Sequence, residues 1–138
     1  MPLYLLDTDH LTLYQHAHPL VTARVTAQGD NEITAAVISY EEQWRGRLAV
    51  IRQAKTRERL ALGYLRLREM QEFFCSLRLL DFDDKAATIL PLLRQLHRRT
   101  GKMDLRIAAT ALAHNAILVT RNTNDFADIE NLQLDNWA

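Results

Sequence analysis

Short apolar runs alternate along the chain with longer stretches in which apolar residues recur every three or four positions. The continuous runs predict strands that are buried on both faces, and the periodic stretches predict amphipathic helices. The expected strands are Pro2–Leu6, Glu32–Val37, Arg78–Phe82, Ala116–Thr120 and Leu132–Leu134. The expected helices span residues 8–15, 19–27, 39–48, 55–77, 83–99 and 104–114. This alternation predicts an α/β fold of three layers (α/β/α), with a central, mainly parallel sheet of four to five strands.

Capping residues set the expected helix boundaries. Thr8 or Asp9 is expected to cap the first helix. Ser39 is expected to cap the third, because Glu42 follows at the spacing of a capping box. Pro91 lies inside the expected fifth helix, where it would kink the backbone. The polar stretch RNTNDF, residues 121–126, is expected to be a loop.

The composition indicates an ordinary globular protein. The chain has 138 residues, of which 48% are hydrophobic and 25% charged, so we expect one domain over residues 1–138. No apolar run approaches the roughly 20 residues of a membrane span, and we recognise no signal peptide. Cys75 is the single cysteine, so an internal disulfide is excluded and a reducing cytoplasm is the expected location. Its apolar neighbours predict a core position.

The charges are segregated, although the formal net charge is zero. Residues 45–102 contain 14 Lys/Arg and 6 Asp/Glu, whereas the rest of the chain contains 3 basic and 11 acidic residues. A cationic block of this kind indicates a polyanionic partner or a strongly charged site.

Acidic residues follow several of the predicted strands. Asp7 follows the first strand, Glu41 and Glu42 follow the second, and Asp125 follows AILVT. The carboxyl ends of parallel strands share one edge of a sheet, which is where functional crevices form. Asp104 begins an alanine-rich helix, where the helix dipole favours an anion. These carboxylates are therefore expected to converge.

Converging carboxylates repel each other and need a counter-charge. A divalent cation that prefers oxygen ligands, such as Mg²⁺, would supply it and would support hydrolysis of a phosphodiester. The alternative is that each acid is a turn residue or a helix cap. For Asp9 we favour a cap or supporting role. Periodicity leaves the choice between Glu41 and Glu42 open.

Four motifs together resemble one known family. LLDTDHL, ISYEEQWRG, MDLRIAATALAHNAILVTRNTNDF and the closing LQLDNW are similar to the motifs of PIN-domain ribonucleases, in particular the VapC-type toxins of toxin–antitoxin pairs. The resemblance spans nearly the whole chain in order. It implies a PIN-like fold and endonucleolytic cleavage of RNA that depends on Mg²⁺ or Mn²⁺. It also implies a VapB-like antitoxin partner, and often a toxin homodimer.

The resemblance assigns roles to individual residues. Its second acid precedes a glycine by four positions, here Gly46, and this selects Glu42 over Glu41. The implied catalytic and metal-binding residues are Asp7, Glu42, Asp104 and Asp125, with supporting roles for Thr8, Thr120 and Asn122. The stretch TGKMD departs from the small residues that are common before the third acid, so Lys102 could contact substrate phosphate. The candidate RNA-binding residues are Arg45, Arg47, Lys102 and Arg121.

Two alternatives remain open from the sequence. A strand followed by Asp-x-Asp also begins HAD-like phosphatases, in which Asp7 would be the nucleophile and Asp9 the acid/base. The other alternative is a non-catalytic PIN-like module that binds only RNA or protein.

Overall fold

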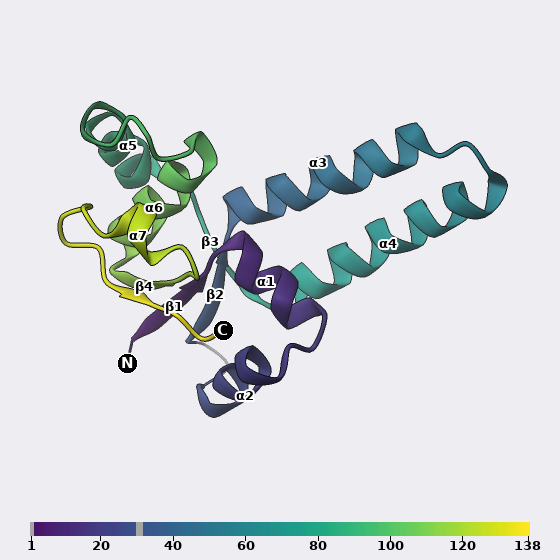
Figure 1. Ribbon diagram of the computed structural model, residues 1–138, viewed down its shortest axis with the longest axis horizontal. Helices are drawn as coiled ribbons and strands as arrows, with labels where there is room; N and C mark the ends of the chain where they lie inside the picture. Colours follow the sequence, from purple (N-terminus) through teal and green to yellow (C-terminus); the bar gives the residue numbers. More distant parts are fainter. Residues whose placement is uncertain (1, 30–31) are drawn as a thin grey trace.

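A parallel sheet forms the centre of the molecule. The computed structural model describes residues 2–29 and 32–138. In this part of the chain five strands lie in the order β3-β2-β1-β4-β5, and every neighbouring pair is parallel (Figure 1). The strands are β1 (Leu3–Leu6), β2 (Ile33–Ala36), β3 (Arg78–Leu80), β4 (Ala116–Val119) and β5 (Leu134–Asp135). The predicted mainly parallel sheet is confirmed.

Helices cover both faces of this sheet, as the three-layer prediction required. They are α1 (Thr8–Gln15), α2 (Pro19–Ala27), α3 (Val37–Gln53), α4 (Arg57–Cys75), α5 (Asp84–Leu96), α6 (Lys102–His114) and α7 (Thr123–Phe126). One core lies between the sheet and α5, α6 and α7, and a second core lies between the sheet and α1, α2 and the end of α4. Figure 1 shows these two groups of helices on opposite sides of the strands.

Consecutive residues of each strand enter opposite cores. Leu5 and Leu118 pack in the core under α5 and α6, whereas Leu6 and Val119 pack in the core under α1 and α2. All four side chains are fully buried. Successive side chains of a strand point to opposite faces, so a strand that is covered on both sides is apolar at every position. This is why the strands read as continuous apolar runs.

The helices α3 and α4 form an antiparallel hairpin that projects away from the sheet (Figure 1). Gly63 lies where the two helices meet, and a Cβ atom there would approach Ile51 Cγ1 to 3.0 Å. The absence of a side chain therefore allows the close approach. The expected end of α3 at Leu48 was wrong, because the helix continues to Gln53 and α4 packs along it. The other predicted boundaries differ from the observed ones by at most three residues.

Three local predictions were wrong. Ser39 does not cap α3: the helix begins earlier at Val37, and the Ser39 hydroxyl lies 2.9 Å from Thr8 Oγ1. Neither Thr8 nor Asp9 caps α1, because Asp7 takes that position. The stretch predicted as a loop contains the short helix α7.

The predicted core position of Cys75 was also wrong. Cys75 is exposed at the end of α4, because its neighbour Phe74 takes the buried position on this turn. None of the helices in residues 2–29 and 32–138 combines the length and the hydropathy that a membrane span requires.

Candidate active site

Asp7 lies where β1 ends and α1 begins. Its backbone N–H donates to Val119 O of the neighbouring strand at 3.0 Å, which extends the parallel pairing by one residue. Its side chain caps α1, because Oδ1 accepts the backbone N–H of His10 at 2.8 Å. The residue is only 8% exposed. Asp7 is therefore a helix cap and also a carboxylate held at the edge of the sheet, so the two roles weighed for it do not exclude each other.

Glu42 projects from α3 toward the same edge. It accepts a hydrogen bond from the Thr8 hydroxyl at 2.7 Å, which ties α3 to α1. Its neighbour Glu41 instead forms an ion pair with Arg45 at 2.7 Å, within α3 itself. Glu42, not Glu41, lines a pocket with Asp7 and Asp104. The structure thus brings Glu42, and not Glu41, next to the other predicted acids of this pocket.

One pocket, called here the acid pocket, gathers these side chains. It is lined by Asp7, Thr8, Asp9, Glu42, Asp104, Arg121 and Asn122. Asp104 lies in the first turn of α6, two residues after the N-terminus of that helix. Burial raises the pKa of the Asp104 carboxyl, and the negative charges of Glu42, Asp7 and Asp125 raise it further. Glu42, Asp7 and Asp125 are thus close enough to disfavour the ionised form of Asp104.

Asp125 approaches from the loop after β4. The side-chain amide of Asn122 donates to Asp125 Oδ2 at 2.6 Å, and the backbone N–H of Asn122 donates to Thr120 Oγ1 at 2.9 Å. Thr120 is fully buried. The buried Thr120 hydroxyl therefore holds the backbone at Asn122, and the Asn122 side chain in turn orients the Asp125 carboxylate. Asp125 lines a groove next to the acid pocket.

Asp9 also lines the acid pocket, but its carboxylate is paired with Arg121. The Arg121 guanidinium donates two hydrogen bonds to the Asp9 carboxylate, at 2.7 and 3.0 Å. The hydrogen bond and the charge of Asp9 raise the pKa of Arg121. One potential metal-ligand atom from each of Asp7, Asp9 and His10 lies within 4.8 Å of the other two. Both ring nitrogens of His10 are already in hydrogen-bond contacts, however, so these three residues do not present three free ligands.

The candidate RNA-binding residues lie in different places. Arg45 is paired with Glu41, and Arg121 is paired with Asp9. Arg47 lines a pocket between α1 and the α3–α4 hairpin, and Lys102 is exposed at the start of α6.

Two further arginines were not singled out from the sequence. Arg98 and Arg99 line the groove that contains Asp125, and neither has an ion-pair partner in the part of the chain that the structure describes. The sequence signal that could have identified them is their position a few residues before Asp104, one of the predicted acids of the site.

Comparison with known proteins agrees with this architecture. The family model described as PIN domain matches residues 4–132. The chain belongs to the PIN domain family. The PIN match covers β1 through the turn before β5, and so includes all four converging acids.

Individual PIN proteins add detail. Ribonuclease VapC2 of Rickettsia felis (strain ATCC VR-1525 / URRWXCal2) is 41% identical over 69 residues, which are 47% of this chain and 52% of that protein. The match thus spans about half the length of this curated relative.

Two solved structures are similar over essentially the whole chain. One is VapBC2 from Rickettsia felis bound to a DNA fragment from its promoter, with a TM-score of 0.76, 27% identity and 99% of both chains covered. The other is DNA-bound VapBC from Salmonella typhimurium, with a TM-score of 0.80, 20% identity and 100% of both chains covered. The second shows the fold alone.

These findings do not favour the two alternatives. A HAD-like phosphatase would need Asp9 free to exchange a proton. The Asp9 carboxylate instead accepts hydrogen bonds from Arg121 Nε and Nη2. A module without catalysis would have no need to hold Asp104 in a pocket beside Glu42 and Asp7, whose negative charges disfavour its ionised form.

The donor set of the acid pocket suits a hard divalent cation. It offers carboxylate oxygens from the N-cap of α1, from α3 and from α6, with Asp125 nearby, and these are the ligands that Mg²⁺ and Mn²⁺ prefer. Burial and then the negative charges of Glu42, Asp7 and Asp125 raise the pKa of Asp104, and a cation in the pocket would offset both effects. The residues therefore fit such an ion.

Proposed function

We propose that this PIN protein is a metal-dependent endoribonuclease and the toxin of a toxin–antitoxin pair, of the VapC type. The observation that carries the proposal is the convergence of Asp7, Glu42 and Asp104 in one pocket, with the charge of Asp125 acting on it. Similarity to Ribonuclease VapC2 and to VapBC2 supports it. A toxin that cleaves cellular RNA would act in the cytoplasm.

The four acids would hold Mg²⁺ or Mn²⁺. When bound, such an ion supplies the Lewis acidity that activates a water molecule and neutralises charge at a phosphodiester. The protein's contribution is to fix the carboxylates in advance. Thr8 donates to Glu42, and Asn122 donates to Asp125, so these two carboxylates are oriented by neighbouring side chains. Oriented carboxylates lose less entropy when they bind a cation or position a water molecule.

We place the RNA backbone in the groove that contains Asp125. This groove is lined by Gln95–Thr100 together with Asn124, Asp125 and Asp128. Arg98 and Arg99 are exposed there, and exposed Lys102 follows on the same segment. Cations next to a cluster of acids are useful for a polyanionic substrate, because they offset its repulsion from the carboxylates.

Replacing both Arg98 and Arg99 with Gln should weaken RNA binding about tenfold at low salt. Each phosphate contact to single-stranded RNA contributes about 0.7 to the slope of log affinity against log salt, so the slope should fall by about 1.4. Fluorescence anisotropy with a labelled single-stranded RNA over a salt series measures both quantities. The matched control is Arg57→Gln with Arg68→Gln, two exposed arginines on α4. Equal slopes for the two double variants would contradict the placement.

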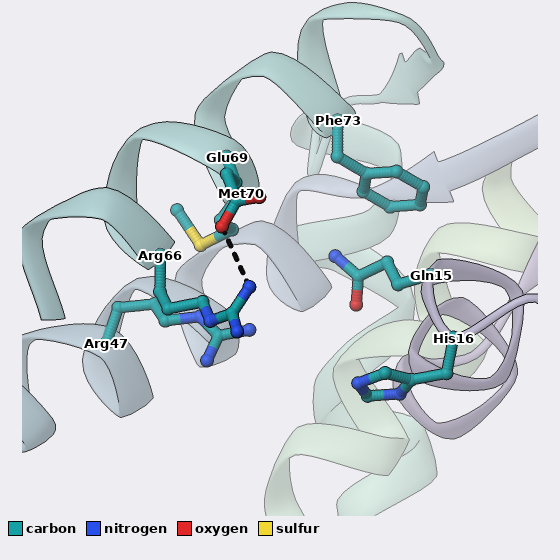
Figure 2. A pocket seen from close by; sticks show the side chains of 7 residues that line it. All are labelled: Gln15, His16, Arg47, Arg66, Glu69, Met70 and Phe73. Carbon is teal, nitrogen blue, oxygen red and sulfur yellow. Dashed lines mark hydrogen bonds and ion pairs between the residues drawn. The ribbon is translucent and has the colours of Figure 1, made fainter. Parts of the chain in front are cut away.

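We propose that the antitoxin binds between α1 and the α3–α4 hairpin. Figure 2 shows a pocket there, with Gln15, His16 and Phe73 on one side of the view and Arg47, Arg66 and Met70 on the other. Arg66 is paired with Glu69 at 2.9 Å, whereas Arg47 has no ion-pair partner among the described side chains. The mixture of cationic and apolar lining suits a peptide with apolar and acidic side chains.

We also propose that the toxin forms a homodimer.

The proposed function predicts that RNA cleavage depends on a divalent cation. The purified protein should cut a mixed single-stranded RNA when Mg²⁺ or Mn²⁺ is present. EDTA should reduce cleavage to background, and excess Mn²⁺ should restore it. A gel of end-labelled RNA measures the rate of loss of the full-length band.

A matched variant controls for contaminating nuclease. Glu42→Gln, purified in the same way, removes one carboxylate of the acid pocket and should cut far more slowly. The equivalent change at the neighbouring acid, Glu41→Gln, should leave the rate nearly unchanged, because Glu41 pairs with Arg45 outside the pocket. Cleavage that resists EDTA, or equal rates for Glu42→Gln and the wild type, would contradict the proposal.

A further inference from the structure

His10 is a buried imidazole that the proposed chemistry does not yet use. It lies on the first turn of α1 and is 0% exposed. One ring nitrogen, Nδ1, lies 3.2 Å from Asp7 Oδ1, and the other, Nε2, lies 3.3 Å from the backbone nitrogen of Trp137. The ring therefore connects the acid pocket to the end of the chain, across 127 positions of sequence.

The contact with Trp137 fixes the tautomer of the ring. A backbone N–H can only donate, so Nε2 must be the acceptor and carries no proton. In the neutral ring the proton is then on Nδ1, which donates to Asp7 Oδ1. Oδ1 also accepts the backbone N–H of His10 at 2.8 Å. Two donors thus hold this one carboxylate oxygen.

The second carboxylate oxygen of Asp7, Oδ2, remains available to a ligand in the acid pocket. Oδ2 accepts no hydrogen bond from the residues that the structure describes, and Asp7 lines the acid pocket. A carboxylate that is held through one oxygen presents the other in a defined direction, as hydrogen-bonded carboxylates around metals do.

The tail that fixes His10 is itself well anchored. Trp137 is 3% exposed, its ring lies 5.1 Å from that of Tyr4 on β1, and its indole N–H donates to Asp135 Oδ2 at 3.0 Å. Arg24 of α2 forms an ion pair with the same oxygen at 3.2 Å and lies over the indole. The last strand and α2 thus hold the backbone N–H that fixes the ring.

We propose that His10, held as the Nδ1–H tautomer by the backbone of Trp137, is a positioning residue that aims Asp7 at the divalent cation. The inference rests on the proposed function, because it presumes that Asp7 binds a metal. It goes further by giving His10 and the C-terminal segment a role in the geometry of the site. His10 does not contact substrate or metal, and acts only through Asp7.

Metal affinity tests the role of the donor. His10→Phe keeps an aromatic ring but removes the hydrogen bond, and should weaken Mn²⁺ binding about 10- to 100-fold, as expected for the loss of a group that orients a ligand. His10→Asn puts an amide donor near the position of Nδ1 and should recover most of the affinity. Isothermal titration with Mn²⁺ measures the constants, and circular dichroism checks the folding of each variant. The control is His114→Phe, which removes a histidine hydrogen bond to Asp81 O outside the acid pocket.

The tautomer itself is tested in the wild type, independently of metal and of any substitution. Nitrogen-15 NMR of the metal-free protein should show His10 with a protonated Nδ1 and an unprotonated Nε2. The opposite tautomer would overturn the inference, as would a His10→Phe variant that folds and binds Mn²⁺ as tightly as the wild type. A wild type that binds no Mn²⁺ would overturn the proposed function and this inference together, so the two failures are distinguishable.

Discussion

Asp104→Asn is expected to slow RNA cleavage by about 100- to 1,000-fold while the metal-free protein becomes more stable. The loss of activity follows because a bound metal contributes several kcal/mol to stabilising the transition state, and each 1.4 kcal/mol is about tenfold in rate. The gain in stability follows because burial and the charges of Glu42, Asp7 and Asp125 disfavour the ionised Asp104. A neutral amide of the same size avoids that repulsion. Cleavage rates and urea unfolding in EDTA measure the two effects.

The same cause gives the metal-free wild type a defined pH dependence. The pKa of Asp104 is raised in the folded protein, so the folded state binds its proton more tightly than the unfolded state does. The contribution of Asp104 to stability is therefore fully present below the pKa that its carboxyl has in the unfolded protein. It is lost as the pH rises through the higher pKa that the carboxyl has in the folded protein. Asp104→Asn should lose this part of the pH dependence, and should also lose stabilisation by Mn²⁺.

Asp81→Asn is the matched control for this variant, because Asp81 is an exposed aspartate outside the acid pocket. It should change neither the cleavage rate nor the stabilisation by Mn²⁺. An Asp104→Asn protein that cuts RNA at the wild-type rate would show that Asp104 is no metal ligand. Lower stability of Asp104→Asn in EDTA would show that the acids do not repel each other as the structure implies.

The sheet was predictable because its strands are buried on both faces. Leu5, Leu6, Leu118 and Val119 are apolar and adjacent in pairs, which is the pattern that a short strand between two helical layers requires. The start of α3 was not predictable in the same way. Ser39 has the side chain of a cap, but in the fold its hydroxyl contacts Thr8, 31 positions away, and this tertiary contact outweighs the local preference.

The acids of the site were predictable from topology, because parallel strands deliver the residues that follow them to one edge. The contacts that orient those acids were not. Asp9 meets Arg121 across 112 positions, and His10 meets Trp137 across 127. No local spacing reports such pairs. They depend on β4 pairing with β1 and on β5 pairing with β4, and these pairings are themselves results of folding.

Phe126→Ala is expected to destabilise the protein by about 3–5 kcal/mol, the usual range when a buried aromatic ring is removed from a core. Phe126 is 1% exposed and packs in the core under α5 and α6. Typical domains are stable by only about 5–15 kcal/mol, so the loss is a large fraction of the total. Urea unfolding followed by circular dichroism measures the change. Phe82→Ala, at a partly buried phenylalanine of the same core, should be clearly less destabilising.

The position of Phe126 also links this core to the acids. It immediately follows Asp125 in the four-residue helix α7, so the ring anchors the segment that carries the carboxylate. Phe126→Leu retains an apolar side chain and should remain folded at low temperature, but a smaller anchor leaves α7 less well fixed. We therefore expect Phe126→Leu to bind Mn²⁺ more weakly than Phe82→Leu, when both are measured under conditions in which each is fully folded. Equal affinities would show that Asp125 is held by Asn122 and Thr120 alone, without the core beneath it.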